Sequence, residues 1–384
     1  MKNILFLMGV YPGIGGVEIV STVLANAFIE KGHEVTLCSF ESKEDAVLCR
    51  LSPKAQLLKL EYPVSSSSNC RILHDYIISH NVEVIIDQWA MPYYVARLCR
   101  QATKRTSCKL IVVHHNLPNT NNHIKELEGK IAEGGFQLLN KMKLAAVRLA
   151  SRLSLRYTYG KCDRFVVLSS RFFGMTSQFI WKNHCSKLVS IPNPITIDGE
   201  YSELDIKENV VLYVGRIEYK QKRNDRLVDV WNEMGEIRKG WKLVIVGDGP
   251  DRHNLQKLIE QRNLSDSVEI VGFQSPVDYY KRAKFLLLTS DYEGFGLVIV
   301  EAMKFGVVPI VYGSYEAVYD IVESGKHGFI TPMPFSAQET ADVLSRLMSD
   351  EAMRSQMSSR AIERSKDFNL NRVVEQWDSL ISTI

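Results

Sequence analysis

Two carboxylates, Glu293 and Glu301, lie eight positions apart in a segment that contains a Gly-Phe-Gly turn. Carboxylates accept hydrogen bonds from sugar hydroxyls, so one group suits a hexose and the other a ribose. The apolar run Phe285–Leu288 before the turn is typical of a buried strand, and the spacing over Leu297–Lys304 is typical of a helix. The first N–H groups of a helix lack intrahelical partners and attract phosphate. The segment therefore predicts a phosphate-binding turn with two sugar contacts; the alternative is two solvated glutamates beside a helix start.

Two cations follow an earlier predicted strand. Gly215-Arg216 comes directly after a strand that ends at Val214, and Lys222 follows six residues after Arg216. Arginine offers a planar fork of donors and lysine a point charge, so the two together suit a diphosphate leaving group. The alternative is that both are ordinary solvated loop cations.

A glycine-rich turn is expected between the first strand and the first helix. Gly13, Gly15 and Gly16 fall there, where a phosphate-binding turn belongs. Their spacing departs from the G-x-G-x-x-G fingerprint, which weakens a dinucleotide interpretation. His114 and His115 follow another strand end in the same half, as groups of the site or as structural histidines.

Strands and helices are expected to alternate along both halves of the chain. The expected strands are 3–8, 34–39, 82–87, 109–113 and 164–168, then 209–214, 241–246, 268–271, 285–289 and 307–311. This alternation is typical of open, mostly parallel sheets with helices on both faces. The fold class is therefore α/β, with two Rossmann-like domains whose strand ends face an interdomain cleft.

Two prolines in the segment 191–195 predict a linker, because proline continues neither a helix nor a central strand. We expect an N-terminal domain over 1–195, a second domain over 196–365, and a final helix over 366–384 that packs back on the first domain. The serine run at 65–68 is expected to be an exposed loop.

The composition indicates a globular chain with a large core, since 45% of its 384 residues are hydrophobic and 24% are charged. Seven cysteines without a C-x-x-C pair favour a reducing cytosol over a zinc cage or a disulfide framework. The apolar run 4–10 leads into a Pro-Gly turn, which favours a first core strand over a signal peptide. No uninterrupted apolar run reaches membrane-spanning length.

Charge is divided unevenly along the chain. Residues 1–195 contain 24 Lys and Arg against 14 Asp and Glu, whereas residues 196–384 contain 23 against 30. A run of basic residues without acidic neighbours contributes to this excess: Lys141, Lys143, Arg148, Arg152, Arg156 and Lys161. With its interleaved apolar residues, the run predicts an amphipathic helix that lies on an anionic membrane surface. The alternative is a core-packing helix with a solvated basic face.

Several motifs occur together and in order: Gly-Gly-Val-Glu at 15–18, Val-Gly-Arg at 214–216 with Lys222, Val-Gly-Asp-Gly-Pro at 246–250, and the run 290–306. In these motifs the chain resembles the family-4 (group 1) glycosyltransferases from residue 3 to about 330. The resemblance implies the GT-B fold and the transfer of a sugar from a nucleotide-activated donor with retention of its anomeric configuration. It also implies that no metal and no cofactor are needed.

The resemblance implies a role for each site residue. Arg216 and Lys222 would neutralise the donor diphosphate, Glu301 would hold the ribose, and Glu293 would hold the transferred sugar. His115 would be the histidine of the cleft, with His114 left open. The implied donor-binding residues are Gly15, Gly16, Gly294, Phe295, Gly296, Leu297 and Glu301.

The leading functional hypothesis is a retaining transferase that moves a hexose or N-acetylhexosamine from a UDP-sugar. The expected acceptor is a membrane-linked glycan or polyprenyl-diphosphate oligosaccharide, reached in the cytoplasm or at the cytoplasmic face of a membrane, and no nucleic acid partner is expected. The alternatives are a transferase with a soluble acceptor, a non-catalytic nucleotide-sugar-binding subunit, and an NAD-dependent oxidoreductase. The altered glycine spacing and the glutamates of the second half count against the last.

Overall fold

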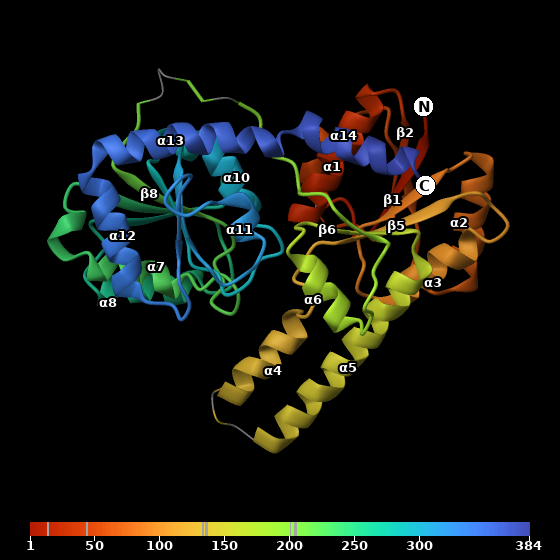
Figure 1. Cartoon of the computed structure of the whole chain (residues 1–384), viewed down its shortest axis with the longest axis horizontal. Coiled ribbons are helices and arrows are strands. Elements are labelled where there is room, and N and C mark those ends of the chain that lie inside the picture. The colour runs from red at the N-terminus through yellow and green to blue at the C-terminus, as the bar shows by residue number, and fades with distance from the viewer. Residues whose placement is uncertain (14, 44, 133, 135–136, 200, 203–205) are drawn as a thin grey trace. The chain divides into compact units, whose positions relative to one another are not determined.

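The computed structural model describes residues 1–384 except 14, 44, 133, 135–136, 200 and 203–205 (Figure 1). The chain divides into two compact units. The first contains Met1–Thr196 and Leu370–Ile384, and the second contains Ile197–Asn369.

The first unit is built on a seven-stranded parallel sheet with the order β3-β2-β1-β4-β5-β6-β7. Its strands are β1 (Asn3–Val10), β2 (Glu34–Glu41), β3 (Gln56–Lys59), β4 (Val84–Asp87), β5 (Lys109–His114), β6 (Arg164–Val167) and β7 (Leu188–Ser190). Its helices are α1 (Gly16–Glu30), η1 (Asp45–Arg50), α2 (Ser67–Ser79), α3 (Tyr93–Ala102), α4 (Asn122–Ala132), α5 (Gln137–Lys161), α6 (Phe172–Phe179) and α14 (Leu370–Ser382).

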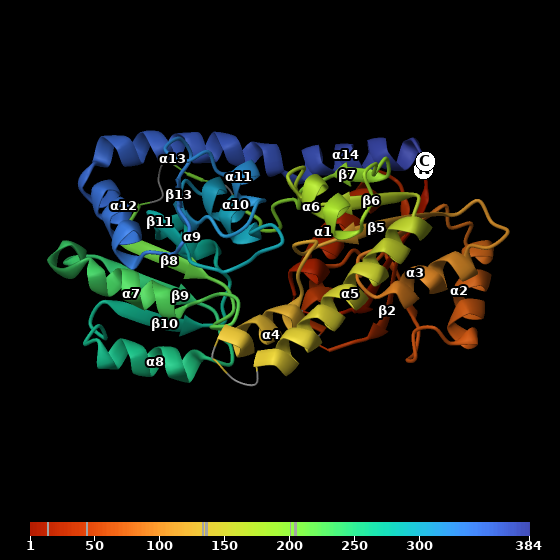
Figure 2. The ribbon, with the colours of Figure 1, turned by 60° about the horizontal axis from the view of Figure 1, so that its bottom comes forward.

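The second unit repeats the architecture on a six-stranded parallel sheet with the order β10-β9-β8-β11-β12-β13. Its strands are β8 (Val210–Val214), β9 (Lys242–Val246), β10 (Val268–Gly272), β11 (Phe285–Leu288), β12 (Val308–Tyr312) and β13 (Phe329–Thr331). Its helices are α7 (Asp225–Glu233), η2 (Gly235–Arg238), α8 (Arg252–Gln261), α9 (Val277–Arg282), α10 (Leu297–Lys304), α11 (Val318–Ile321), α12 (Ala337–Ser349), α13 (Glu351–Ser365) and η3 (Lys366–Phe368). Helices α8 and α13 lie on opposite sides of this sheet (Figure 2).

The two parallel sheets confirm the predicted fold class. Parallel strands are covered on both faces, so their apolar runs are buried almost without interruption, as in β4, β11 and β12. The strands β3, β7 and β13 were not predicted. Each is three or four residues long and lies at a sheet edge, where no long apolar run marks it.

The loop expected at the serine run 65–68 is confirmed only for Ser65 and Ser66, and it is wrong for the two serines that follow. Helix α2 begins at Ser67, and the side chain of Ser66 accepts a hydrogen bond from the backbone N–H of Asn69 at 3.1 Å. Serine is a preferred N-cap because its side chain satisfies one of the unpaired N–H groups of the first turn. The serine run therefore starts a helix.

Helix α14 completes the first unit by packing against α1 (Figure 1). Trp377 and Leu380 are buried, at 3% and 7% exposure. Asp378 accepts a hydrogen bond from the ammonium of Lys31 at the end of α1, at 2.7 Å. The C-terminal segment is therefore part of the fold of the first unit.

Candidate active site

The turn between β11 and α10 has a backbone that only glycine accommodates at one position. Gly296 caps α10 with φ +89°, and none of the described side chains caps this helix start. A Cβ atom at Gly296 would lie 2.5 Å from the hydroxyl oxygen of Tyr315. The dipole of α10 favours an anionic ligand at this start, which no described side chain caps, although the Ile299 N–H is already bound to the Gly296 carbonyl at 2.9 Å.

The ion pair between Lys222 and Glu293 lies at this turn. The Lys222 ammonium is 2.6 Å from Oε1 of Glu293, and the two side chains are 20% and 10% exposed. Lys222 comes from the loop after β8, and Glu293 comes from the loop after β11. Two neighbouring parallel strands thus bring a cation and a carboxylate together at their carboxyl ends.

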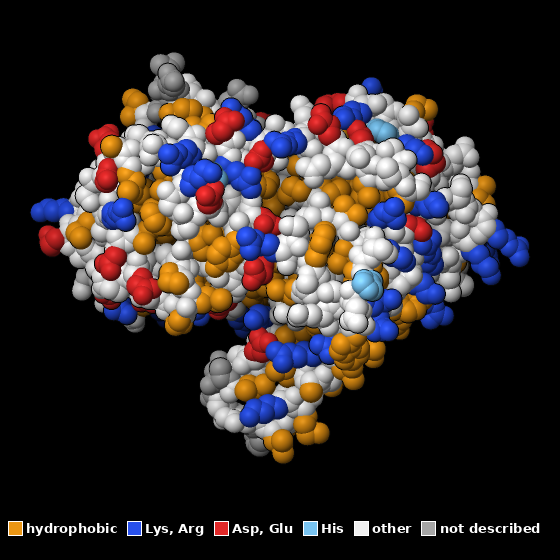
Figure 3. Space-filling model, in the orientation of Figure 1, with side chains coloured by type: hydrophobic (Ala, Val, Ile, Leu, Met, Phe, Trp, Pro, Cys, Tyr) orange, Lys and Arg blue, Asp and Glu red, His pale blue; other side chains and the backbone are white. Residues whose placement is uncertain are grey.

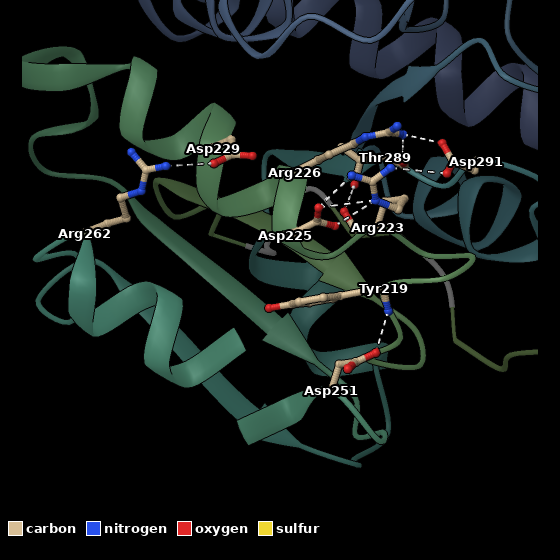
Figure 4. Close-up of polar contacts among 9 residues, drawn as sticks. All are labelled: Tyr219, Arg223, Asp225, Arg226, Asp229, Asp251, Arg262, Thr289 and Asp291. Carbon is tan, nitrogen blue, oxygen red and sulfur yellow. Dashed lines mark hydrogen bonds and ion pairs between the residues drawn. The ribbon is translucent and has the colours of Figure 1, made fainter. Parts of the chain in front are cut away.

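Ion pairs and hydrogen bonds connect the loop that carries Lys222 to the segment that follows β11 (Figure 4). Asp291 accepts hydrogen bonds from Arg226 at 2.6 Å and from Arg223 at 3.4 Å. Arg223 also donates to Asp225 at 2.7 Å, and the backbone N–H of Asp291 donates to the carbonyl of Gln221 at 2.8 Å. These bonds on both sides of Lys222 restrict where its ammonium can lie.

Further bonds in Figure 4 continue this support. The Thr289 hydroxyl donates to the carbonyl of Arg223 at 3.0 Å, and the Thr289 carbonyl accepts from Arg226 at 3.1 Å. The backbone N–H of Tyr219 donates to Asp251 at 2.8 Å. Sequence reasoning assigned no role to these supporting residues. The sequence feature that could have indicated them is their position: Thr289 directly follows β11, and Asp225 is the first residue of α7.

Arg216 also comes from the loop after β8, but its side chain is more exposed. The side chain is 54% exposed, and its guanidinium lies 2.7 Å from Oε2 of Glu218. Close backbone contact holds the start of this loop, because a Cβ atom at Gly247 would lie 1.9 Å from the Gly215 carbonyl oxygen. Each predicted phosphate-binding cation therefore has a carboxylate partner, which a diphosphate would have to share or replace.

The negative charge of Glu293 affects the pKa values of three buried tyrosines. Burial raises the pKa values of Tyr213, Tyr292 and Tyr315, and the Glu293 charge raises all three further. The pKa of Tyr292 reaches about 12. The phenols therefore stay neutral at physiological pH. The Tyr315 hydroxyl has no hydrogen-bond partner among the described residues, so this buried donor is available close to Gly296.

Both glutamates are buried, so the alternative of two solvated glutamates is wrong. Glu293 is 8% exposed and Glu301 is 5% exposed. The Tyr280 hydroxyl lies 3.4 Å from Oε2 of Glu301. Phe295, between the two glycines, packs its ring against Phe368 at a centroid distance of 5.8 Å. Phe295 can therefore serve a ligand only through its backbone.

The glycine turn of the first unit leads into α1. Gly15 caps this helix with extended backbone, and Gly15 and Gly16 are both exposed. A Cβ atom at Gly16 would meet no described atom within 4 Å, whereas one at Gly15 would lie 2.2 Å from Oε2 of Glu18. Burial raises the pKa of Glu18. The Glu18 carboxylate thus folds back over the turn where a phosphate was expected.

The two histidines have different surroundings. His114 is 3% exposed, its Nδ1 lies 2.8 Å from the Asn116 carbonyl, and its ring stacks on Phe165. His115 is partly exposed, and its Nε2 lies 2.5 Å from Oε1 of Gln88. Burial lowers the pKa of His114 to about 4 and that of His115 to about 3. His114 is therefore a core group, and His115 is the member of the pair with an accessible edge.

Comparison with known proteins gives the family of the chain. Residues 14–198 match the model "Glycosyltransferase Family 4", and residues 198–364 match "Glycosyl transferases group 1". The chain belongs to this glycosyltransferase family. The two matches adjoin at residue 198, next to the boundary between the compact units.

Individual relatives of this glycosyltransferase are distant. An uncharacterized glycosyltransferase of Haemophilus influenzae is 23% identical over 99% of the chain and 100% of its own length. A Campylobacter jejuni N-acetyl-D-galactosaminyltransferase, named for a PP-undecaprenol-linked glycan, is 26% identical over 61% of the chain and 64% of its own length. The structure of Anabaena HepE in complex with UDP covers 100% of both chains at 17% identity, with a TM-score of 0.78. The last comparison shows that the transferase has the GT-B fold.

The basic run of the transferase forms part of α5, and its three arginines contact other residues of the chain. Arg148 lies 2.7 Å from Glu128 of α4. Arg152 stacks on the ring of Trp181 at 4.3 Å, and Arg156 donates to the carbonyls of Ile180 and Trp181 at 3.0 Å. No helix among the described residues combines the length and the apolar character that a bilayer crossing requires.

The start of α5, by contrast, projects away from the sheet together with α4 and is both apolar and basic (Figure 3). Leu138, Leu139 and Met142 are 75%, 51% and 63% exposed. Lys141 and Lys143 are exposed among them. Helices α4 and α5 pack on each other as a helical hairpin, and we call these five residues the hairpin tip. Directly after the tip, Leu144 packs on Ile124 and Leu127 of α4 and holds the two helices together.

Proposed function

We propose that this glycosyltransferase moves a hexose or N-acetylhexosamine, with retention, from a UDP-sugar to a membrane-linked glycan or polyprenyl-diphosphate oligosaccharide. The observation that carries the proposal is the largely buried Lys222–Glu293 pair beside the uncapped start of α10. These groups match two parts of such a donor: the cation and the start of the helix suit its diphosphate, and the carboxylate suits its hydroxyls.

The donor contacts follow from this arrangement and from the family resemblance. We assign the diphosphate to Arg216, Lys222 and the N–H groups that begin α10. Glu301 takes the ribose hydroxyls, and Glu293 takes a hydroxyl of the transferred sugar together with the backbone of 294–297. The Tyr315 hydroxyl supplies a further donor beside Gly296. Gly15 and Gly16 of the first unit are assigned to the phosphates on the resemblance.

The chemistry requires stabilisation of a leaving group. As the bond between the sugar carbon and the phosphate oxygen breaks, negative charge builds up on the diphosphate, and preorganised cations and N–H groups stabilise it. The acceptor oxygen forms the new bond on the same face of the sugar and gives its proton to the departing phosphate. A double displacement instead needs a free carboxylate about 5 Å from an acid. Since Glu293 is bound to Lys222, we assign it a positioning role.

UDP and the lipid-linked acceptor are supported by the relatives. The Anabaena protein holds UDP in its structure, and the Campylobacter transferase is named for an undecaprenol-linked glycan.

The hairpin tip of this chain also supports a membrane-linked acceptor. Exposed leucine and methionine side chains with two lysines suit the headgroup region of an anionic membrane. We propose that the tip lies on the cytoplasmic face of that membrane, a smaller surface than the whole basic run.

Thermal unfolding with a panel of nucleotides tests the donor assignment. A ligand that binds the folded state raises the midpoint of unfolding with its concentration. We expect UDP and one UDP-sugar to raise it more than GDP or ADP, and Lys222→Ala to reduce the rise. Product analysis with lipid-linked and soluble acceptors then separates the acceptor classes. If no nucleotide raises the midpoint and no donor releases its nucleotide, the proposal is wrong.

A further inference from the structure

Gln88 and His115 meet at the carboxyl edge of the first sheet. Gln88 directly follows β4 and His115 directly follows β5, and these strands are paired neighbours. Oε1 of Gln88 lies 2.5 Å from Nε2 of His115. Gln88 is 6% exposed, and its amide nitrogen has no partner among the described residues. Within the described part of the chain, the contact with His115 is thus the side-chain hydrogen bond that orients this amide.

The contact determines which nitrogen of His115 carries the proton. Burial keeps the imidazole neutral at physiological pH by lowering its pKa, so the ring holds one proton. An amide oxygen only accepts hydrogen bonds, so the imidazole nitrogen that faces it must donate. The proton therefore lies on Nε2, and Nδ1 keeps a lone pair. In this tautomer Nδ1 accepts hydrogen bonds and does not donate them.

We propose that Gln88 is a positioning residue that holds His115 as the Nε2-protonated tautomer, so that Nδ1 accepts a hydrogen bond from a sugar hydroxyl. A neutral acceptor pairs with an O–H group and repels phosphate oxygens, which points to a hydroxyl and not to the diphosphate. The tautomer follows from this chain's own geometry, whereas the sugar as ligand rests on the proposed function. The hydroxyl belongs either to the transferred sugar or to the acceptor sugar.

NMR of the ¹⁵N-labelled full chain tests the tautomer directly and needs no turnover. We expect the His115 ring in the wild type to carry its proton on Nε2 at pH 7. Gln88→Leu removes the acceptor and should mix the tautomers, while Gln88→Glu places a carboxylate beside the ring and should raise the His115 pKa. Gln56→Glu is the matched control, since Gln56 accepts a hydrogen bond from the Tyr76 hydroxyl elsewhere in the unit. A wild-type ring protonated on Nδ1 would overturn the proposal.

Binding and kinetics identify the hydroxyl. Gln88→Leu should weaken the affinity for the UDP-sugar relative to UDP about tenfold if the transferred sugar binds His115, or raise the acceptor KM about tenfold if the acceptor does. In Gln88→Glu the same loss should appear only as the pH falls below the raised His115 pKa, because protonated Nδ1 cannot accept. A folded Gln88→Leu protein with both quantities unchanged, or a pH-independent Gln88→Glu, would refute the assignment.

Discussion

The ammonium of Lys222 lies 2.6 Å from the carboxylate of Glu293, and both side chains are largely buried. The cation proposed for the diphosphate and the carboxylate proposed for the sugar are therefore already joined in the protein alone. In the proposed assignment, a donor brings phosphate oxygens to Lys222 and hydroxyls to Glu293, so the two contacts are coupled. This coupling shapes how the site is expected to respond to substitution.

The loop that carries Lys222 should loosen when Asp291 loses its charge. Asp291→Asn weakens the bonds to Arg226 and Arg223, and we expect the second unit to lose about 1–3 kcal/mol of unfolding free energy, with weaker nucleotide binding. Asp229→Asn is the control, because Asp229 makes one exposed ion pair with Arg262 at 3.5 Å. Chemical denaturation and calorimetry measure both quantities. Equal effects of the two substitutions would show that Asp291 is not a special support.

Two glycines should respond to alanine in opposite ways. Gly16→Ala adds a methyl group that meets no described atom within 4 Å, so the protein should fold normally while phosphate approach to the turn is hindered. Gly296→Ala forces alanine to φ +89° against the Tyr315 hydroxyl and should destabilise the protein by about 1–3 kcal/mol. Denaturant midpoints and UDP affinity separate the cases. A Gly16→Ala protein with unchanged affinity would remove this turn from the donor contacts.

The free energy of unfolding should decrease as the pH rises from about 4 to about 7, because of Asp87. Burial raises the pKa of this carboxyl from 3.8 to about 7. Between these values the folded protein binds more protons than the unfolded chain, so the contribution is full at low pH and is lost as pH rises through about 7. Asp87→Asn, which keeps an acceptor for the Trp89 N–H, should gain stability relative to wild type from pH 4 to pH 7. Asp75→Asn at the surface is the control; a difference that does not change with pH would contradict the prediction.

The hairpin tip should control membrane binding. Leu138→Ser with Met142→Ser removes exposed apolar groups, and Lys141→Glu with Lys143→Glu reverses the charge. Each pair should lower binding to vesicles that contain anionic lipid about tenfold or more, with the second effect reduced by salt.

Ile237→Ser with Lys239→Glu is the control for the hairpin tip. It makes the same kinds of change at another exposed site, where Ile237 is 55% exposed. If vesicle sedimentation shows the same loss for the control, or no loss for the tip, the tip is not the binding surface.

The positions of the long strands along the chain were predictable because parallel strands buried on both faces leave continuous apolar runs. One example is β11, whose apolar run is Phe285–Leu288. The apolar spacing of the next helix likewise predicted its bounds, Leu297–Lys304. Short edge strands such as β3 carry no such run. The capping role of Ser66 was missed because a serine run is equally typical of a loop.

The chemical groups of the site were predictable, but their pairing was not. Glu293 and Lys222 are 71 residues apart, and a sequence pattern does not show that they share a hydrogen bond. Their proximity depends on β8 and β11 being neighbours in the sheet and on the bonds to Asp291. The hydrogen bond from His115 to Gln88 depends in the same way on β4 and β5 being neighbours.

The most direct test of the site is the rate of sugar transfer by Lys222→Ala, Glu293→Ala and the double variant, measured with the UDP-sugar that binds. Each single variant should lose about 10²–10³ in kcat/KM while remaining folded by circular dichroism. Lys222→Ala removes a preorganised cation at the reacting diphosphate, and Glu293→Ala removes the carboxylate that positions Lys222 and the transferred sugar. The double variant should be hardly slower than the worse single variant, since the two groups act as a unit. Wild-type turnover in a folded Lys222→Ala protein would contradict the account.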